Sequence, residues 1–71
     1  MSLDKYTRFK ISANVLGRTM KELADEAGVT HQTIKGVCDG KITSSRLTRF
    51  IDEKITKAEE IYNEYRKQKT A

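Results

Sequence analysis

The sequence predicts an all-α fold, a small four-helix domain whose long last helix overhangs the rest. Apolar residues recur every three or four positions, which is the helical period, and no segment alternates as a half-buried strand does. The chain also has no proline, and Gly17, Gly28 and Gly40 lie between the periodic segments. A chain of 71 residues forms one domain with a small core, because it buries only about 60% of the surface of its unfolded form.

The first helix is expected from about Leu3 to Val15. Gly17 follows it, and a glycine closes a helix well because it adopts the left-handed conformation without a steric penalty. Residues three or four apart share one face of a helix, so one stripe should be buried. That stripe is predicted to consist of Tyr6, Phe9, Ala13 and Leu16.

The second helix, about Met20 to Ala27, begins with the pattern of a capping box. The Thr19 hydroxyl can accept from the backbone three residues on, and Glu22 can reach back to the Thr19 N–H. We expect three small or apolar side chains to be buried: Leu23, Ala24 and Ala27.

A third helix, about His31 to Asp39, is predicted to follow after a very short turn. Gly28 stands where a C-terminal glycine cap belongs, and Thr30 can cap the start of the next helix. Gly40 ends that helix. The residues expected to hold the turn and the third helix against the core are Val29, Ile34, Val37 and Cys38.

A fourth helix is predicted to start after Thr43 or Ser44 and to reach about Lys67. About 24 residues make a rod of roughly 36 Å, whereas a compact domain of this size is only about 28 Å across. The helix must therefore overhang. Its apolar stripe is Leu47, Phe50, Ile51, Ile55, Ala58, Tyr62 and Tyr65.

The second and third helices together have the pattern of a helix-turn-helix. Ala24 is small where the helices cross, Gly28 supplies the turn and Val29 is apolar. The segment 19–40 resembles the lambda-repressor-like helix-turn-helix DNA-binding family, of the Cro and Xre type. The resemblance extends loosely to about residue 55. The matching positions are Thr19, Leu23, Ala24, Gly28, Val29, Thr30, Gln32, Ile34, Val37 and Gly40.

The resemblance implies that the third helix enters the major groove of double-stranded DNA while the second crosses the backbone. A helical wheel agrees, because steps of about 100° place Gln32 and Lys35 away from Ile34. Residues that could read bases are His31, Gln32, Thr33, Lys35 and Gly36. Candidates for phosphate contacts are Arg18, Thr19, Lys21, Thr30, Lys41 and Arg46.

Two residues of the third helix need a separate explanation. Gly36 costs about 1 kcal/mol relative to Ala in a helix, so either it lets the helix approach the DNA groove closely or the flexibility is tolerated. Asp39 departs from the family, in which an uncharged polar residue often lies near phosphate. We expect Asp39 to pair with Lys35, four residues earlier.

The charge distribution is compatible with a polyanionic partner. The net charge is +4, with nine basic and five acidic residues in segment 1–50 and five of each in 51–71. A solvated surface explains the same charges.

One Cys and one His exclude an internal disulfide and a tetrahedral Cys/His zinc site, and no cofactor is expected. The start of the sequence lacks the apolar stretch of a signal peptide, so a cytoplasmic protein is expected.

The last helix carries a possible association surface. Its apolar residues from 51 to 65 follow intervals of four and three, the spacing of a coiled-coil seam. We divide the chain into a DNA-binding domain, 1–55, and a C-terminal extension, 56–71. A homodimer is favoured over docking of another protein or packing back onto the domain, and half-sites would lie about 34 Å apart. The predicted interface comprises Ile51, Ile55, Ala58, Ile61, Tyr62 and Tyr65.

The function expected from the resemblance is sequence-specific transcription regulation, by a repressor of phage or mobile-element type that binds a palindromic operator as a dimer. The alternative is a protein-interaction module, such as an antirepressor or inhibitor, that binds a protein through its last helix. An enzyme is not expected, because the sequence has no paired carboxylates, no nucleophile beside a base and no phosphate-binding loop.

Overall fold

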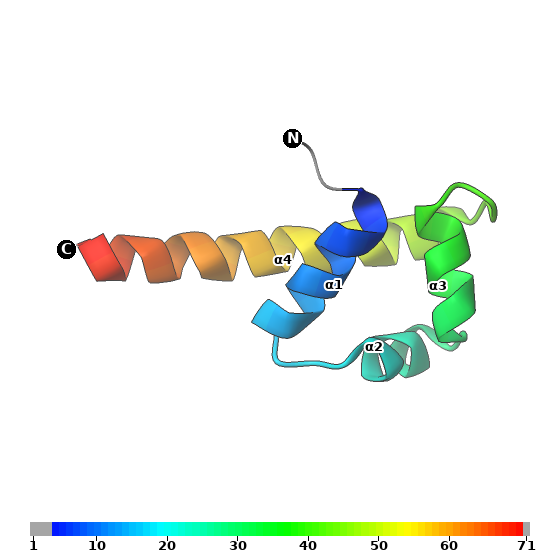
Figure 1. The fold of residues 1–71 in the computed structure, drawn as a ribbon, viewed down its shortest axis with the longest axis horizontal. Helices are drawn as coiled ribbons and strands as arrows, with labels where there is room; N and C mark the ends of the chain where they lie inside the picture. The colour runs from blue at the N-terminus through cyan, green and yellow to red at the C-terminus, as the bar shows by residue number, and fades with distance from the viewer. Residues whose placement is uncertain (1–3, 71) are drawn as a thin grey trace.

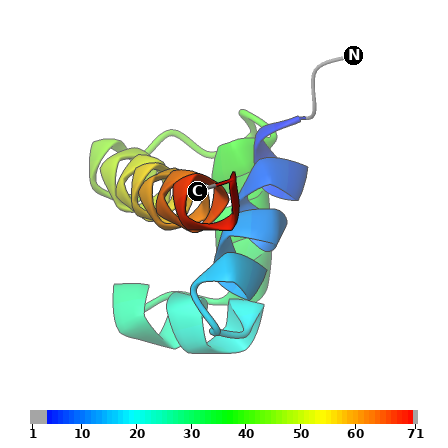
Figure 2. The same cartoon turned by 90° about the vertical axis from the view of Figure 1, so that its left-hand side faces the viewer.

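The computed structural model describes residues 4–70, with side chains as far as Lys67. Within them the protein is all-helical, as predicted: α1 (Lys5–Val15), α2 (Met20–Ala27), α3 (His31–Cys38) and α4 (Ser45–Thr70). The long α4 spans the molecule, and its C-terminal turns extend past the other helices (Figure 1). The described part measures 43 × 27 × 17 Å, so the predicted overhang is confirmed. Figure 2 looks along α4 and shows the three shorter helices grouped around two sides of it.

The predicted helix boundaries hold within a few residues. The structure starts α1 at Lys5 because Asp4 caps it, and the predicted start at Leu3 lies outside the described residues. The helix α3 ends one residue earlier than predicted, and α4 continues three residues beyond Lys67.

Side chains cap the start of every helix. Asp4 accepts the Thr7 N–H at 2.7 Å, and the Ser44 hydroxyl accepts the Leu47 N–H at 3.3 Å. The predicted capping box of α2 is present, with bonds of 3.1 and 2.9 Å between Thr19 and Glu22. Each cap satisfies backbone donors that have no partner inside the helix. The caps therefore fix where the chain turns, including at Thr30, which caps α3.

The reversal between α2 and α3 depends on Gly28. Its backbone has φ 76° and ψ 28°, a left-handed conformation in which a side chain would be strained. Its N–H donates to Asp25, and the N–H of Val29 donates to Ala24. These bonds end α2 in the manner predicted for a glycine cap.

The core lies where α1 and α2 meet α3 and the first half of α4. Leu23, Ile34 and Val37 are buried as predicted, which fixes the inner face of the helix-turn-helix. In α1 the buried stripe is narrower than predicted, because Tyr6 and Leu16 are only half-buried while Ser12 is buried. The remaining buried apolar residues are Phe9, Ala13, Ala24, Ala27, Leu47, Ile51, Ile55 and Ala58.

The prediction that Ile51, Ile55 and Ala58 form an interface is wrong. They are only 0%, 6% and 3% exposed because α1 packs along this part of α4. Packing continues past the predicted domain boundary at residue 55, since Arg8 on α1 forms an ion pair of 3.0 Å with Glu59. The exposed part of the apolar stripe begins only after this point.

No helix within residues 4–70 has both the length and the apolar character to cross a bilayer.

Candidate nucleic-acid interface

The helix α3 has one anchored face and one exposed face. Ile34 is 0% exposed and Val37 is 9% exposed, whereas Gln32 and Lys35 lie on the solvent side. The outward direction of the two polar side chains is therefore as predicted. An α-helix with its side chains is about 10–12 Å in diameter, and the major groove, about 12 Å wide, admits one.

The exposed face of α3 continues onto α1. The Tyr6 hydroxyl is hydrogen-bonded to His31 Nε2, and the two rings lie 5.8 Å apart. The Nζ atoms of Lys10 and Lys35 lie 5.7 and 5.8 Å from the Tyr6 ring, within reach of a cation–π interaction. We call this set, together with Gln32, the α1–α3 face.

Sequence reasoning missed Tyr6 and Lys10 as members of this face. Spacing alone places Tyr6 in a buried stripe, and Tyr6 lies 25 positions before His31 in the sequence. The only available signal is that a tyrosine at the edge of an apolar stripe carries a hydroxyl that needs a polar partner.

Acidic groups partly offset the positive charge of the α1–α3 face. Lys35 lies 4.0 Å from Asp39, so the predicted pair forms at the limit of an ion pair. Asp4 lies near Lys10 and Lys35. Its pKa is lowered mainly by the hydrogen bond from the Thr7 N–H, with smaller contributions from the two lysines. A polyanion on this face must therefore approach the lysines and avoid two carboxylates.

Two threonines proposed for DNA contact are already bonded to each other. The Thr30 hydroxyl accepts the Thr33 N–H at 3.2 Å, and the two hydroxyl oxygens are 2.9 Å apart. Thr33 is only half-exposed. Both side chains therefore stabilise the start of α3. The Thr19 hydroxyl likewise stabilises the start of α2 by accepting the Glu22 N–H.

The structure gives a different reason for Gly36 from a close approach to DNA. A Cβ at this position would lie 2.5 Å from Ile42 Cδ1 and 2.9 Å from Cγ1. The Gly36 carbonyl also accepts the N–H groups of Lys41 and Ile42, at 2.8 and 3.1 Å. The loop after α3 thus folds back over Gly36. Ile42 occupies the space beside this glycine that a close approach to DNA would require.

Apart from Thr19 and Thr30, which cap helices, the candidates for phosphate contact separate into two groups. Arg46 donates to the Ala27 carbonyl at 3.0 Å, and Arg18 pairs with Glu26 at 3.1 Å and Glu22 at 4.0 Å. These arginines therefore tie parts of the fold together. Two lysines are exposed and have no ion-pair partner within residues 4–67, namely Lys21 and Lys41.

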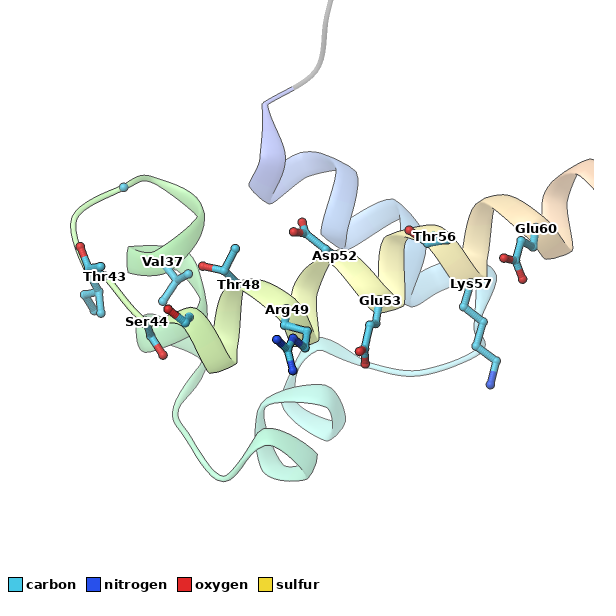
Figure 3. Close-up of a pocket in the computed structure, with 13 residues that line it drawn as sticks. Val37, Thr43, Ser44, Thr48, Arg49, Asp52, Glu53, Thr56, Lys57 and Glu60 are labelled. Atoms are coloured by element: carbon cyan, nitrogen blue, oxygen red, sulfur yellow. The ribbon is translucent and has the colours of Figure 1, made fainter.

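A further depression of the described surface lies along the outer face of α4 and the loop before it. It is open, with a volume of about 890 Å³, and its charged side chains point in different directions (Figure 3). Arg49 and Lys57 point to one side while Asp52 points to another, where it pairs with Lys5 at 2.7 Å. The groups do not converge on one point as the ligands of a small molecule do.

Comparison with known proteins gives no match to a family model, to a curated protein or to a solved structure.

Proposed function

We propose that this protein is a sequence-specific DNA-binding regulator of transcription, and that it represses by placing α3 in the major groove of a palindromic operator as a dimer. One observation carries the proposal. Gln32 and Lys35 are exposed on a short helix whose opposite face, Ile34 and Val37, is fixed in the core after the turn at Gly28.

The exposed side chains have the chemistry that base recognition needs. The amide of Gln32 can bond N6 and N7 of an adenine, and the ammonium of Lys35 can donate to O6 or N7 of a guanine. The burial of Ile34 fixes the orientation of the backbone that presents them. Sequence readout requires such fixed positions, because a mobile side chain gives affinity without discrimination.

Backbone contacts would come from the surroundings of α3. Lys21 lies in the first turn of α2, where the helix dipole and free N–H groups also attract phosphate. Lys41 lies in the loop after α3. The bond between Tyr6 and His31 joins α1 to the first residue of α3.

The proposal is tested by titrating fragmented genomic DNA with the protein at two salt concentrations, followed by variants. Binding should weaken steeply with salt, because each neutralised phosphate releases counterions. Gln32→Ala and Lys35→Ala should each weaken binding to a selected operator by about 1–3 kcal/mol. Lys57→Ala is the matched control, since it removes an exposed lysine from the outer face of α4.

Equal affinities for the wild type and for the Gln32 and Lys35 variants would refute the assignment of the face. Equal losses of DNA affinity from Lys35→Ala and Lys57→Ala would show that Lys35 contributes only nonspecific electrostatic attraction.

A second candidate function is a protein-interaction module that binds a partner through α4. It is favoured by the exposed apolar residues near the end of α4, where Ile61, Tyr62 and Tyr65 are 44%, 53% and 58% exposed. Absence of salt-dependent DNA binding in the titration would favour this candidate.

A further inference from the structure

The Tyr6 side chain on α1 contacts two of the residues that would read bases. Its hydroxyl is hydrogen-bonded to His31 Nε2, and its ring centroid lies 5.8 Å from Lys35 Nζ. His31 and Lys35 are four residues apart, so they lie on the same side of α3. One side chain from another helix therefore supports two neighbouring side chains of the exposed face.

The bond between Tyr6 and His31 is not needed to hold α1 against α3. The two helices already share the core, in which Phe9 of α1 and Ile34 of α3 are both 0% exposed. The hydrogen bond lies at the surface, where water competes for both partners and the net gain in stability is small. Its larger effect is on the exposed His31 ring, which would otherwise move between rotamers.

The partner of Nε2 determines what the other nitrogen of the His31 ring can do. A phenol hydroxyl is a stronger acid than an imidazole N–H, and an imidazole nitrogen is a stronger base than a phenol oxygen. Tyr6 therefore donates and Nε2 accepts. A neutral imidazole carries one proton, which is then on Nδ1. The bond thus leaves the Nδ1–H as the hydrogen-bond donor of the ring.

We propose that Tyr6 is a positioning residue for DNA recognition: its hydroxyl holds the His31 ring so that Nδ1–H donates to an acceptor on DNA. This inference rests on the proposed function, because DNA supplies the acceptor. Suitable acceptors are N7 and O6 of guanine in the major groove and the oxygen atoms of phosphate. Tyr6 acts through His31 and need not touch DNA itself.

The charges around Tyr6 favour an acceptor that belongs to a polyanion. Lys10 is exposed, and its Nζ lies 5.7 Å from the same ring that Lys35 approaches. Asp39 is 4.0 Å from Lys35, a distance that leaves the ammonium free to turn toward DNA. An acceptor beside His31 would therefore also meet positive charge, which strengthens its hydrogen bonds when the acceptor is anionic.

The arrangements open to a free ring give the size of the expected effect. A free histidine side chain samples about three χ1 rotamers and about two neutral tautomers, roughly six arrangements, of which one offers the N–H correctly. A ring that is oriented before binding does not incur this cost. Loss of the Tyr6 hydroxyl should therefore weaken DNA binding about sixfold for each half-site that the protein occupies.

A double-mutant cycle of Tyr6→Phe and His31→Ala, read as operator affinity, tests the proposal. Phenylalanine keeps the aromatic ring and removes only the hydroxyl, so the loss should be about sixfold per half-site. His31→Ala removes the donor and should cost about tenfold or more. In the His31→Ala protein, Tyr6→Phe should have no further effect, because no ring is left to orient. Thr56→Val is the matched control, since it removes an exposed hydroxyl from the outer face of α4 (Figure 3) and should leave DNA affinity unchanged.

Nitrogen NMR of the protein without DNA tests the bond itself. The chain has one histidine, so the signals of its ring need no assignment. In alkaline solution the neutral ring of the wild type should carry its proton on Nδ1, and Tyr6→Phe should return a mixture of both tautomers. The melting temperatures of the two proteins should agree, because the bond is exposed.

Two results would overturn the inference while the proposed function stands. One is a set of ring signals that Tyr6→Phe leaves unchanged, and the other is operator binding that Lys35→Ala weakens and Tyr6→Phe does not. Equal losses from Tyr6→Phe with and without His31 would also overturn it, since the hydroxyl would then act without the ring. A wild type that binds no DNA would remove the proposed function and this inference together.

Selection of bound sequences with His31→Ala separates the two kinds of acceptor. If Nδ1–H donates to a base, preference should relax at one position of each half-site. If it donates to phosphate, binding should weaken alike for all sequences. A selection and an affinity that both match the wild type would show that His31 makes no contact with DNA, and would overturn the inference.

Discussion

Gly36→Ala sets two effects of similar size against each other. Alanine in place of glycine within a helix gains about 1 kcal/mol. The new Cβ, however, would lie 2.5 Å from Ile42 Cδ1, so that side chain must move. Ile42 is 41% exposed and can move at a cost near the lower end of the 1–3 kcal/mol typical of overpacking, about 1 kcal/mol. We therefore expect the free energy of unfolding of this variant to stay close to that of the wild type.

Removal of the Ile42 side chain separates the two effects. The Ile42 Cβ would be 3.7 Å from the new methyl group, an ordinary contact, so Ile42→Ala relieves the overlap. Ile42→Ala alone should destabilise by about 1 kcal/mol, since it removes a partly buried side chain. Adding Gly36→Ala to this variant should then recover about 1 kcal/mol, which gives a coupling of about 1 kcal/mol between the two positions.

Urea unfolding followed by circular dichroism measures all four proteins of this cycle. Additive effects, with Gly36→Ala stabilising by the same amount whether or not Ile42 is present, would refute the reasoning. DNA binding by the double variant checks the rival explanation. If Gly36 were needed for a close approach to the groove, this variant would lose operator affinity although its fold is stable.

Gly28→Ala should destabilise the protein by about 1–2 kcal/mol, because the residue has φ 76° and alanine is strained there. No other atom lies within 4 Å of the added Cβ, so unchanged stability in thermal or urea unfolding would contradict the turn conformation. Acidification should also destabilise the fold. The pKa of Glu22 is lowered, first by the hydrogen bond from the Thr19 N–H, and that of Glu26 by Lys54. A lowered folded-state pKa stabilises the fold above the ordinary value of 4.5, and this contribution is lost as the pH falls through the folded-state value. Glu22→Gln keeps the cap but does not titrate, so its melting temperature should fall less steeply below pH 4.5; a parallel decline would argue against the assignment.

Local signals in the sequence were sufficient for the elements of the fold. The capping box at Thr19 and the glycine at Gly28 act within a few residues of themselves, so their effects can be read without the rest of the chain. The burial of Ile34 followed from the same helical spacing. These features predicted the turn and the outward direction of Gln32 and Lys35.

Contacts between distant segments could not be read from spacing. The seam from Ile51 to Ala58 has the same intervals whether it faces a partner or α1, and the structure shows α1 against it. Likewise the roles of Gly36 and Arg46 depend on Ile42 and on the Ala27 carbonyl, neither of which shares a helix with them. A periodic pattern indicates that a face is buried but not what buries it.

Selection of bound sequences from a random pool of duplex DNA tests the central claim most directly, that the exposed face of α3 reads DNA. An inverted repeat should be enriched, and repeating the selection with Gln32→Ala or Lys35→Ala should relax the base preference at single positions in each half-site. A pool that stays random with the wild type, or an enriched sequence that both variants select unchanged, would contradict the claim.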